Sequence, residues 1–286
     1  MHWQALLDDI ATELRPRLGA EGKVASYIPA LARVSPLQFG IALRTGDGQT
    51  AAAGDALVPF SIQSVSKLFT LTLAMRTLGD ALWERIHREP SGNPFINAGA
   101  IAVADRLVSA GDARAKLVEM LSGLAGEPIG FDDEVAASEA ATGYRNIALA
   151  NFMKGFGKLD NGAAEVLDFY FHQCAVRMNC VQLARAAGYL CRDGAHPLGG
   201  DAVVSERQAR RLNALMLTCG TYDAAGEFAY RIGLPCKSGV GGGIVAVVPD
   251  RLTLAVWSPA VDGSGNSVLG TAALEMFANR SGLSIF

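Results

Sequence analysis

The segment Ser64-Val65-Ser66-Lys67 carries a hydroxyl and an amine at a spacing that suits nucleophilic chemistry. If this segment is helical, Ser64 and Lys67 lie three residues apart on one face, where a neutral lysine can take the serine proton. A free lysine has a pKa of about 10.4, so work near pH 7 requires its pKa to be lowered by about three units. Burial and a second cation can supply that shift. Taken alone, the same pattern also fits an ordinary helix start.

A second cation and hydroxyl occur in Lys237-Ser238-Gly239, just before the C-terminal β-rich runs. Lys237 could lower the pKa of Lys67 and hold an anionic substrate, while strand N–H groups could stabilise an oxyanion. A glycine-rich turn before a strand is the alternative interpretation. The glycine run matches neither GxGxxG nor GxxxxGK[ST], so we exclude nucleotide binding.

Together, an early Ser-x-x-Lys and a late Lys-Ser-Gly form the motif pair of the penicillin-recognising serine acyltransferases. Their third element, Ser-x-Asn, has two candidates here, Ser91-Gly92-Asn93 and Ser264-Gly265-Asn266. Both are short matches that chance readily produces.

The elements that must position these residues follow from hydrophobic periodicity. β-rich runs near both ends of the chain predict one antiparallel sheet flanked by helices, with an all-helical subdomain inserted, a mixed α/β (α+β) fold. We expect a single catalytic domain over 1–286, with the α/β part at about 1–67 and 219–286 and the helical subdomain at about 68–218. The predicted strands are 37–44, 244–248 and 252–257; the predicted helices are 3–17, 66–78, 98–109, 113–124, 139–154, 163–176, 179–192, 205–217 and 266–280, the last capped by Asn266 or Ser267.

Composition excludes several classes of protein. The 286 residues are 50% hydrophobic and carry a net charge of −3 with scattered basic residues, which argues against a nucleic-acid partner. No apolar run is long enough for a membrane span, and the N-terminus does not resemble a signal peptide. Five cysteines without a Cys-x-x-Cys pair predict reduced thiols in a cytoplasmic protein, and the four histidines lack metal-ligand spacing, so we expect no metal.

The sequence resembles the serine-dependent glutaminases, a family with the β-lactamase/transpeptidase fold. The resemblance extends over nearly the whole chain and keeps the order of the family's segments. The segments that carry it are GKVASYIPALARV (22–34), SIQSVSKLFTL (61–71), EPSG (89–92), NPFINAGAI (93–101), SEAATGYRNIALA (138–150), LDFYFHQCA (167–175), CGTYDAAGEFAY (219–230), GLPCKSGVGGGI (233–244) and WSPAVDGSGNSVLG (257–270).

The resemblance implies hydrolysis of L-glutamine to L-glutamate and ammonia without a cofactor, by a homo-oligomer (dimer or tetramer). It implies that Ser64 is the nucleophile, Lys67 its base, and Tyr222 the group that relays a proton to Ser64 or to the leaving ammonia. It further implies an oxyanion hole from the N–H groups of Ser64 and Val240, and substrate contacts from Tyr27, Gln63, Asn97, Glu139, Asn146, Tyr170, Tyr222 and Val240.

These residue types suit glutamine. A carboxylate such as Glu139 pairs with the α-ammonium, while Asn97, Asn146 and Tyr170 donate to the α-carboxylate without adding charge. Taken singly, Asn97 is more typical of a helix cap and Glu139 of a first helical turn. The tyrosines also fit core or rim positions. We interpret His172 as structural, and Cys174, Cys219 and Cys236 as small buried hydrophobes.

One departure concerns the junction of Gly92 and Asn93, where the family carries a longer segment with a Phe-Asn pair. Either this loop is absent, or the two motifs are not contiguous in the protein; the intact flanking motifs favour the second alternative. A bonded junction would place the two Cα atoms about 3.8 Å apart.

Two other functions stay open at this point. A β-lactamase or D,D-peptidase of the same fold would hydrolyse nitrocefin but not glutamine, and the absence of a signal peptide argues against it. A non-catalytic amino-acid binding protein would bind without turnover, yet Ser64, Lys67, Tyr222 and Lys237 are all present. The resemblance also implies a preference for glutamine over asparagine. One methylene contributes only about 1–3 kcal/mol in a passive pocket, so strong discrimination requires displaced polar contacts and not only a difference in size.

Overall fold

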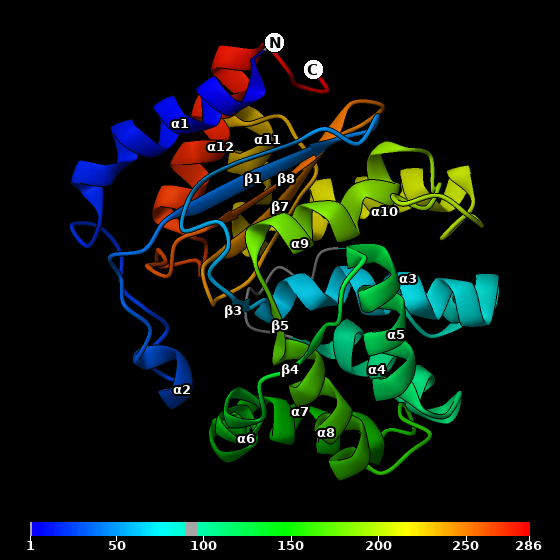
Figure 1. Ribbon diagram of the computed structural model, residues 1–286. Coiled ribbons are helices and arrows are strands. Elements are labelled where there is room, and N and C mark those ends of the chain that lie inside the picture. The colour runs from blue at the N-terminus through cyan, green and yellow to red at the C-terminus, as the bar shows by residue number, and fades with distance from the viewer. Residues whose placement is uncertain (1, 90–96) are drawn as a thin grey trace.

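The computed structural model describes residues 2–89 and 97–286. A central antiparallel sheet lies between two groups of helices, and a helical part lies beside it (Figure 1). The sheet has the order β2-β1-β8-β7-β6, so strands from the two ends of the chain pair at its centre. Its strands are β1 (Gly40–Thr45), β2 (Thr50–Gly54), β6 (Cys236–Ser238), β7 (Gly243–Val248) and β8 (Leu252–Trp257). The predicted sheet from N- and C-terminal strands is confirmed.

Both faces of this sheet are covered, which explains the nearly continuous apolar runs of β7 and β8. Ile41 and Leu43 of β1 pack with α1, α11 and α12, whereas Ala42 points to the opposite face and joins the core under α9. The first group of helices is α1 (Trp3–Leu14), α11 (Ala225–Arg231) and α12 (Val268–Ser281). The opposite face is covered by α9 (Cys180–Ala186) and the 3₁₀ turn η4 (Ala187–Cys191).

The helical part surrounds α3, the helix that follows Ser64 (Figure 1). Its helices are α3 (Ser66–Leu78), α4 (Ala98–Ser109), α5 (Ala113–Ala125), α6 (Asp133–Thr142), α7 (Tyr144–Gly155) and α8 (Ala163–Cys174). The remaining helical elements are η1 (Arg15–Arg17), α2 (Pro29–Ala32), η2 (Gln63–Val65), η3 (Gly79–Glu84), α10 (Glu206–Cys219) and η5 (Tyr222–Ala224).

The inserted part, expected to be all-helical, also contains two short strands. β4 (Gly130–Phe131) and β5 (Val176–Met178) pair with β3 (Phe60–Ser61) in a second sheet of order β3-β5-β4. These strands are two or three residues long, so they lack the period-two signal that predicts a strand. Because β3 directly precedes Ser64, this small sheet attaches the candidate nucleophile to the helical part.

Three predicted helices end or break at positions that differ from the expectation. The helix expected at 139–154 is two helices, α6 and α7, that meet at Gly143. A Cβ at Gly143 would lie 2.7 Å from the carbonyl oxygen of Glu139 and 2.8 Å from the Phe171 ring, so α8 approaches too closely for a larger residue. The helix expected at 179–192 changes to a 3₁₀ turn after Ala186, and the one expected at 163–176 ends at Cys174, where the chain enters β5.

Candidate active site

Ser64 lies in a turn that is held from both sides. The preceding Ile62 donates its N–H to the carbonyl of Val176 in β5 at 2.9 Å, and Ser61 Oγ donates to the Cys174 carbonyl at 2.8 Å. Gln63 adopts a left-handed conformation with φ +49°, which is uncommon for a non-glycine residue and occurs often at functional sites. The turn η2 then runs into α3, so Ser64 and Lys67 share one helical face as the sequence predicted.

Lys67 is half-buried, and burial lowers the pKa of its amine. The nearby Cys174 and Glu139 counter part of this shift. Lys67 Nζ donates to Asn97 Oδ1 at 2.6 Å and lies 5.9 Å from the centre of the Tyr170 ring. A neutral amine can donate this hydrogen bond and still keep a lone pair to accept a proton.

The second lysine, Lys237 of β6, is buried at the sheet edge. Its Nζ donates to the carbonyl of Gly220 at 2.8 Å and to that of Ser238, and lies 4.9 Å from the centre of the Tyr222 ring. Burial, and then the charge of Lys67, hold the pKa of Lys237 well below its ordinary value. The two lysines are therefore electrostatically coupled, and this coupling lowers the pKa of Lys237.

Tyr222 follows α10 in a left-handed conformation with φ +60°. Burial raises the pKa of its phenol, while Ser64 and Ser238 lie close enough to counter part of that rise. Within the described residues, the buried Tyr222 hydroxyl makes no hydrogen bond of ordinary geometry. The phenol therefore keeps its proton near neutral pH and lies close to Ser64 and Ser238.

One cavity of about 530 Å³ collects nearly all the predicted site residues. Lys67 and Lys237 are not among those that line it; they lie behind the wall next to Asn97 and Tyr222. The predicted residues that line the cavity are Tyr27, Gln63, Ser64, Asn97, Glu139, Asn146, Tyr170, Tyr222 and Val240.

Glu139 lies in the middle of α6, so its interpretation as a first-turn acid is wrong. Its side chain is buried, and burial raises the pKa of the carboxyl to about 7; Gln63 and Lys67 counter part of the rise. A carboxyl of this kind is stabilised as a carboxylate when a cation enters the cavity.

Asn97 is the residue before α4, yet its side chain makes no capping hydrogen bond. Its oxygen accepts from Lys67, and its Nδ2 donates to Asn146 Oδ1 at 2.9 Å. Tyr170 from α8 is 2% exposed, and its ring centre lies 5.9 Å from Lys67 Nζ. The alternative of a simple helix cap therefore does not account for Asn97.

Val240 lies in the turn between β6 and β7, which presses against the turn of Ser64. A Cβ at Gly239 would lie 2.6 Å from the Ile62 carbonyl oxygen and 3.0 Å from the Ser64 nitrogen. Gly242 donates to the Gly239 carbonyl at 2.9 Å and closes this turn. Only glycine permits so close an approach of two backbones.

Sequence reasoning missed several residues of the cavity wall. Cys174 lines the cavity as a thiol, because burial raises its pKa to about 12. The sequence also predicted that Cys219 is buried, and this prediction is wrong. Cys219 is half-buried, and its sulfur lies 3.6 Å from the Arg88 carbonyl oxygen. Tyr27 is 57% exposed and forms the rim. The other wall residues are Ile28 and the stretch 142–145, which lies between Glu139 and Asn146 in a segment that the sequence had singled out.

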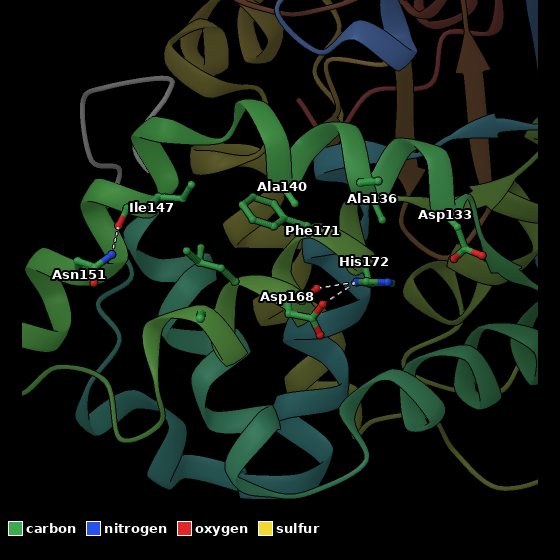
Figure 2. Close-up of a pocket in the computed structure, with 11 residues that line it drawn as sticks. Asp133, Ala136, Ala140, Ile147, Asn151, Asp168, Phe171 and His172 are labelled. Atoms are coloured by element: carbon green, nitrogen blue, oxygen red, sulfur yellow. Dashed lines mark hydrogen bonds and ion pairs between the residues drawn. The ribbon is translucent and has the colours of Figure 1, made fainter.

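A second pocket, of about 630 Å³, lies between α6, α7 and α8 (Figure 2). It contains none of the predicted catalytic or substrate-binding residues. His172 borders it, with Nδ1 2.7 Å from the Asp168 carbonyl oxygen and its ring edge-on to Phe131 at 5.6 Å. Burial lowers the pKa of His172. These contacts agree with the interpretation of His172 as a structural residue.

The candidate triplet Ser91-Gly92-Asn93 and the Gly92–Asn93 junction lie outside the described residues. Among residues 2–89 and 97–286, no cluster of three or more histidine, cysteine or acidic side chains could hold a metal ion. In the same part of the chain, no helix combines the length and apolar character that a membrane crossing requires.

The fold is β-lactamase-like: an antiparallel sheet is flanked by helices, a serine and a lysine lie at the start of a helix, and a second lysine lies on the edge strand. Within that class, this chain belongs to the glutaminase family, whose model matches residues 22–286. It is an amidohydrolase that converts glutamine to glutamate and ammonia.

The relatives span the chain almost completely. A glutaminase of Rhizobium meliloti is 55% identical over 305 residues, which cover 99% of this chain and 96% of the relative; one of Rhizobium rhizogenes is 54% identical, with 99% and 98% covered. The matched length of 305 exceeds the 286 residues here, so the relative carries residues without a counterpart in this chain. A solved Bacillus subtilis glutaminase, in covalent complex with 5-oxo-L-norleucine formed from 6-diazo-5-oxo-L-norleucine, is similar with a TM-score of 0.94 and 37% identity, covering 100% of both chains.

Proposed function

We propose that hydrolysis proceeds through an acyl-enzyme on Ser64. Ser64 Oγ attacks the side-chain carbonyl carbon of glutamine, and its proton passes to Lys67 Nζ. The C–N bond then breaks, and ammonia leaves with a proton that Tyr222 relays. Water attacks the resulting ester, releases glutamate and restores the Ser64 hydroxyl. The observation that carries this proposal is the lowered pKa of the half-buried Lys67, one helical turn after Ser64.

The oxyanion is stabilised by the N–H groups of Ser64 and Val240. The close packing of the Gly239 turn on the turn of Ser64 supports this pair, since it brings the two backbones together. Removing one donor of an oxyanion hole typically raises the barrier by about 3–4 kcal/mol.

The two ends of glutamine are recognised by different walls of the cavity. The carboxylate of Glu139 pairs with the α-ammonium, and the amides and phenols of Asn97, Asn146 and Tyr170 donate to the α-carboxylate. Gln63 and Tyr27 complete the contacts from the floor and the rim. The buried position of Glu139 beside Gln63 and the Asn97–Asn146 hydrogen bond support this division.

Lys237 supports the reaction from behind Tyr222. Its contact with the Tyr222 ring and its hydrogen bonds to Gly220 and Ser238 hold the sheet edge against the turn of Tyr222.

The cavity has walls from both parts of the chain: Ser64 and Tyr222 come from the sheet side, and Glu139 and Tyr170 from the helical side. We therefore propose one catalytic domain over 1–286, with the α/β part at about 1–67 and 219–286 and the helical part at about 68–218.

The enzyme is proposed to work in the cytoplasm as a homo-oligomer. Five free thiols fit a reducing compartment.

The aromatic residues Tyr144, Phe152 and Phe156 on and after α7 are 65–75% exposed, which is typical of a surface that a partner covers. Light scattering on the purified protein measures the assembly size, and a monomer at all concentrations contradicts this part of the proposal.

The proposal is tested with the glutamine analogue that reacts with the Bacillus subtilis relative. After incubation with 6-diazo-5-oxo-L-norleucine, peptide mapping by mass spectrometry is expected to find the adduct on Ser64 and to find none in Ser64→Ala. An adduct elsewhere contradicts the assignment of the nucleophile. Nitrocefin and asparagine serve as alternative substrates, and comparable kcat/KM for asparagine contradicts strict preference for glutamine.

A further inference from the structure

The loop between β8 and α12 packs against the back of Tyr222. A Cβ at Gly265, whose φ is +89°, would lie 3.5 Å from Tyr222 Cε2 and 3.3 Å from Val240 Cγ1. The loop is held in shape by Asp262, whose Oδ1 accepts from the N–H groups of Ser264 at 2.9 Å and Asn266 at 3.0 Å. It therefore forms a wall behind two residues of the active site.

Asn266 reaches from this loop to the residue before Tyr222. Its side chain is fully buried, and Nδ2 donates to the Thr221 carbonyl at 3.3 Å. Within residues 2–89 and 97–286, its Oδ1 has no hydrogen-bond partner, so the contact to Thr221 is the hydrogen bond that anchors this side chain. Neither Asn266 nor Ser264 is among the residues that line the active-site cavity.

Tyr222 needs such an anchor because of its backbone. Tyr222 is a non-glycine residue in the left-handed region, a strained conformation that is kept only where the surroundings fix it. The carbonyl of Gly220 accepts from Lys237 Nζ at 2.8 Å and from the Ser238 N–H at 3.1 Å. The carbonyl of Thr221 accepts from the Ala224 N–H at 3.2 Å, within the same turn, and from Asn266 Nδ2, which joins it to the loop before α12. Both carbonyls that precede Tyr222 are thus held.

We propose that Asn266 is a positioning residue that holds the Tyr222 hydroxyl at Ser64 through the Thr221 carbonyl. Gly265 and Asn266 then support the site from behind: the glycine leaves room for the Tyr222 ring, and the Asn266 amide holds the backbone before Tyr222. This inference rests on the proposed role of Tyr222 in proton relay. It predicts that Asn266 contributes to kcat only while Tyr222 has its hydroxyl.

The test is a double-mutant cycle on the full chain, measured as ammonia release from L-glutamine over pH 6–9. Tyr222→Phe is expected to lower kcat about 10²-fold or more, the usual contribution of a positioned acid or base. Asn266→Ala is expected to lower kcat about tenfold in the wild-type background, the effect of one lost hydrogen bond. In the Tyr222→Phe background, the same change is expected to lower kcat less than about twofold.

Ser264→Ala is the matched control from the same loop, and we expect it to keep wild-type kcat. If Asn266→Ala does not fold, as judged by circular dichroism, Asn266→Ser replaces it, since serine is too short to reach Thr221. Equal losses in both backgrounds, or no loss in the wild-type background, overturn the positioning role. If Tyr222→Phe itself keeps wild-type kcat, the proposed role of Tyr222 is what fails.

Discussion

The active-site cavity and the pocket between α6, α7 and α8 have similar volumes but different walls. Helices α6 and α8 contribute residues to the walls of both. Glu139 and Tyr170 face the active site, while their neighbours Ala140 and Phe171 face the second pocket (Figure 2). Successive residues of a helix point about 100° apart, so one helix can serve two cavities. Volume alone therefore does not identify the site.

The titratable groups of the active site are more deeply buried than those of the second pocket. In the active site, burial shifts the pKa values of Lys67, Glu139 and Tyr222 away from their ordinary values. In the second pocket, Asp168 is 56% exposed at its side chain and forms an ion pair with Arg114. Buried groups without a full counter-charge are poised to exchange protons, whereas a paired and solvated carboxylate is structural.

The largest expected effect is the loss of the nucleophile. Ser64→Ala is expected to lower kcat about 10⁴- to 10⁶-fold, the range for removing the serine of an acyl-enzyme mechanism. The measurement is ammonia release from L-glutamine by the purified variant, with circular dichroism to verify its fold. Activity within tenfold of wild type contradicts the assignment of Ser64.

Next in size is the loss of the general base. Lys67→Met keeps the length of the side chain but removes the amine, and we expect kcat to fall about 10²- to 10⁴-fold. Since Asn97 loses its donor as well, the control is Asn97→Ala, whose main expected effect is on KM. If Lys67→Met and Asn97→Ala show the same profile, Lys67 serves binding rather than proton transfer.

A smaller effect is expected at Glu139, and it carries a pH signature. The carboxyl has a pKa of about 7, so it is charged above that pH and neutral below it. Because only the charged form pairs with the α-ammonium, kcat/KM is expected to fall as pH drops through 7. Glu139→Gln should raise KM about 10- to 100-fold at pH 8, the contribution of a charged hydrogen bond.

The control for Glu139 is the shape of the pH profile. In Glu139→Gln, KM is expected to lose its dependence on pH between 6 and 8. A variant whose KM still rises towards low pH would assign that titration to another group, such as Lys67.

The smallest effect is expected in the second pocket. Ala140→Leu adds an apolar side chain to an exposed position of that pocket, one residue from Glu139 on the same helix. Steady-state kinetics are expected to give kcat/KM within about twofold of wild type, as for most surface substitutions. A loss as large as that of Glu139→Gln would mean that the two cavities are not independent.

The sequence predicts the long elements well and the short ones poorly. The helices α3, α4 and α5 are predicted closely, because each extends over three or more turns and contributes several buried apolar residues. The strand β2, with the sequence TAAAG, was missed because alanine carries little strand preference. The break at Gly143 depends on how closely Phe171 approaches, which is a tertiary contact that no local pattern contains.

The same distinction holds for the site. Residue types and family order located the residues that line the cavity. The sequence could not give the left-handed backbone of Gln63 and Tyr222, because neither residue favours that conformation. Nor does the sequence show that the Asn97 side chain bonds to Lys67 and does not cap a helix, since both roles fit the same position in the sequence.

The pairing of β1 with β8 also bears on how the enzyme is made. Arg44 and Thr253 are direct partners in the sheet although 209 residues separate them. During synthesis, Ser64 leaves the ribosome long before Tyr222, Lys237 and Val240, and the sheet that unites them cannot close until the last strands emerge. Pairings of such long range form late, after local helices. The nascent chain therefore carries its proposed nucleophile before the cavity around it exists, and we expect catalysis to begin only when the C-terminal strands complete the sheet.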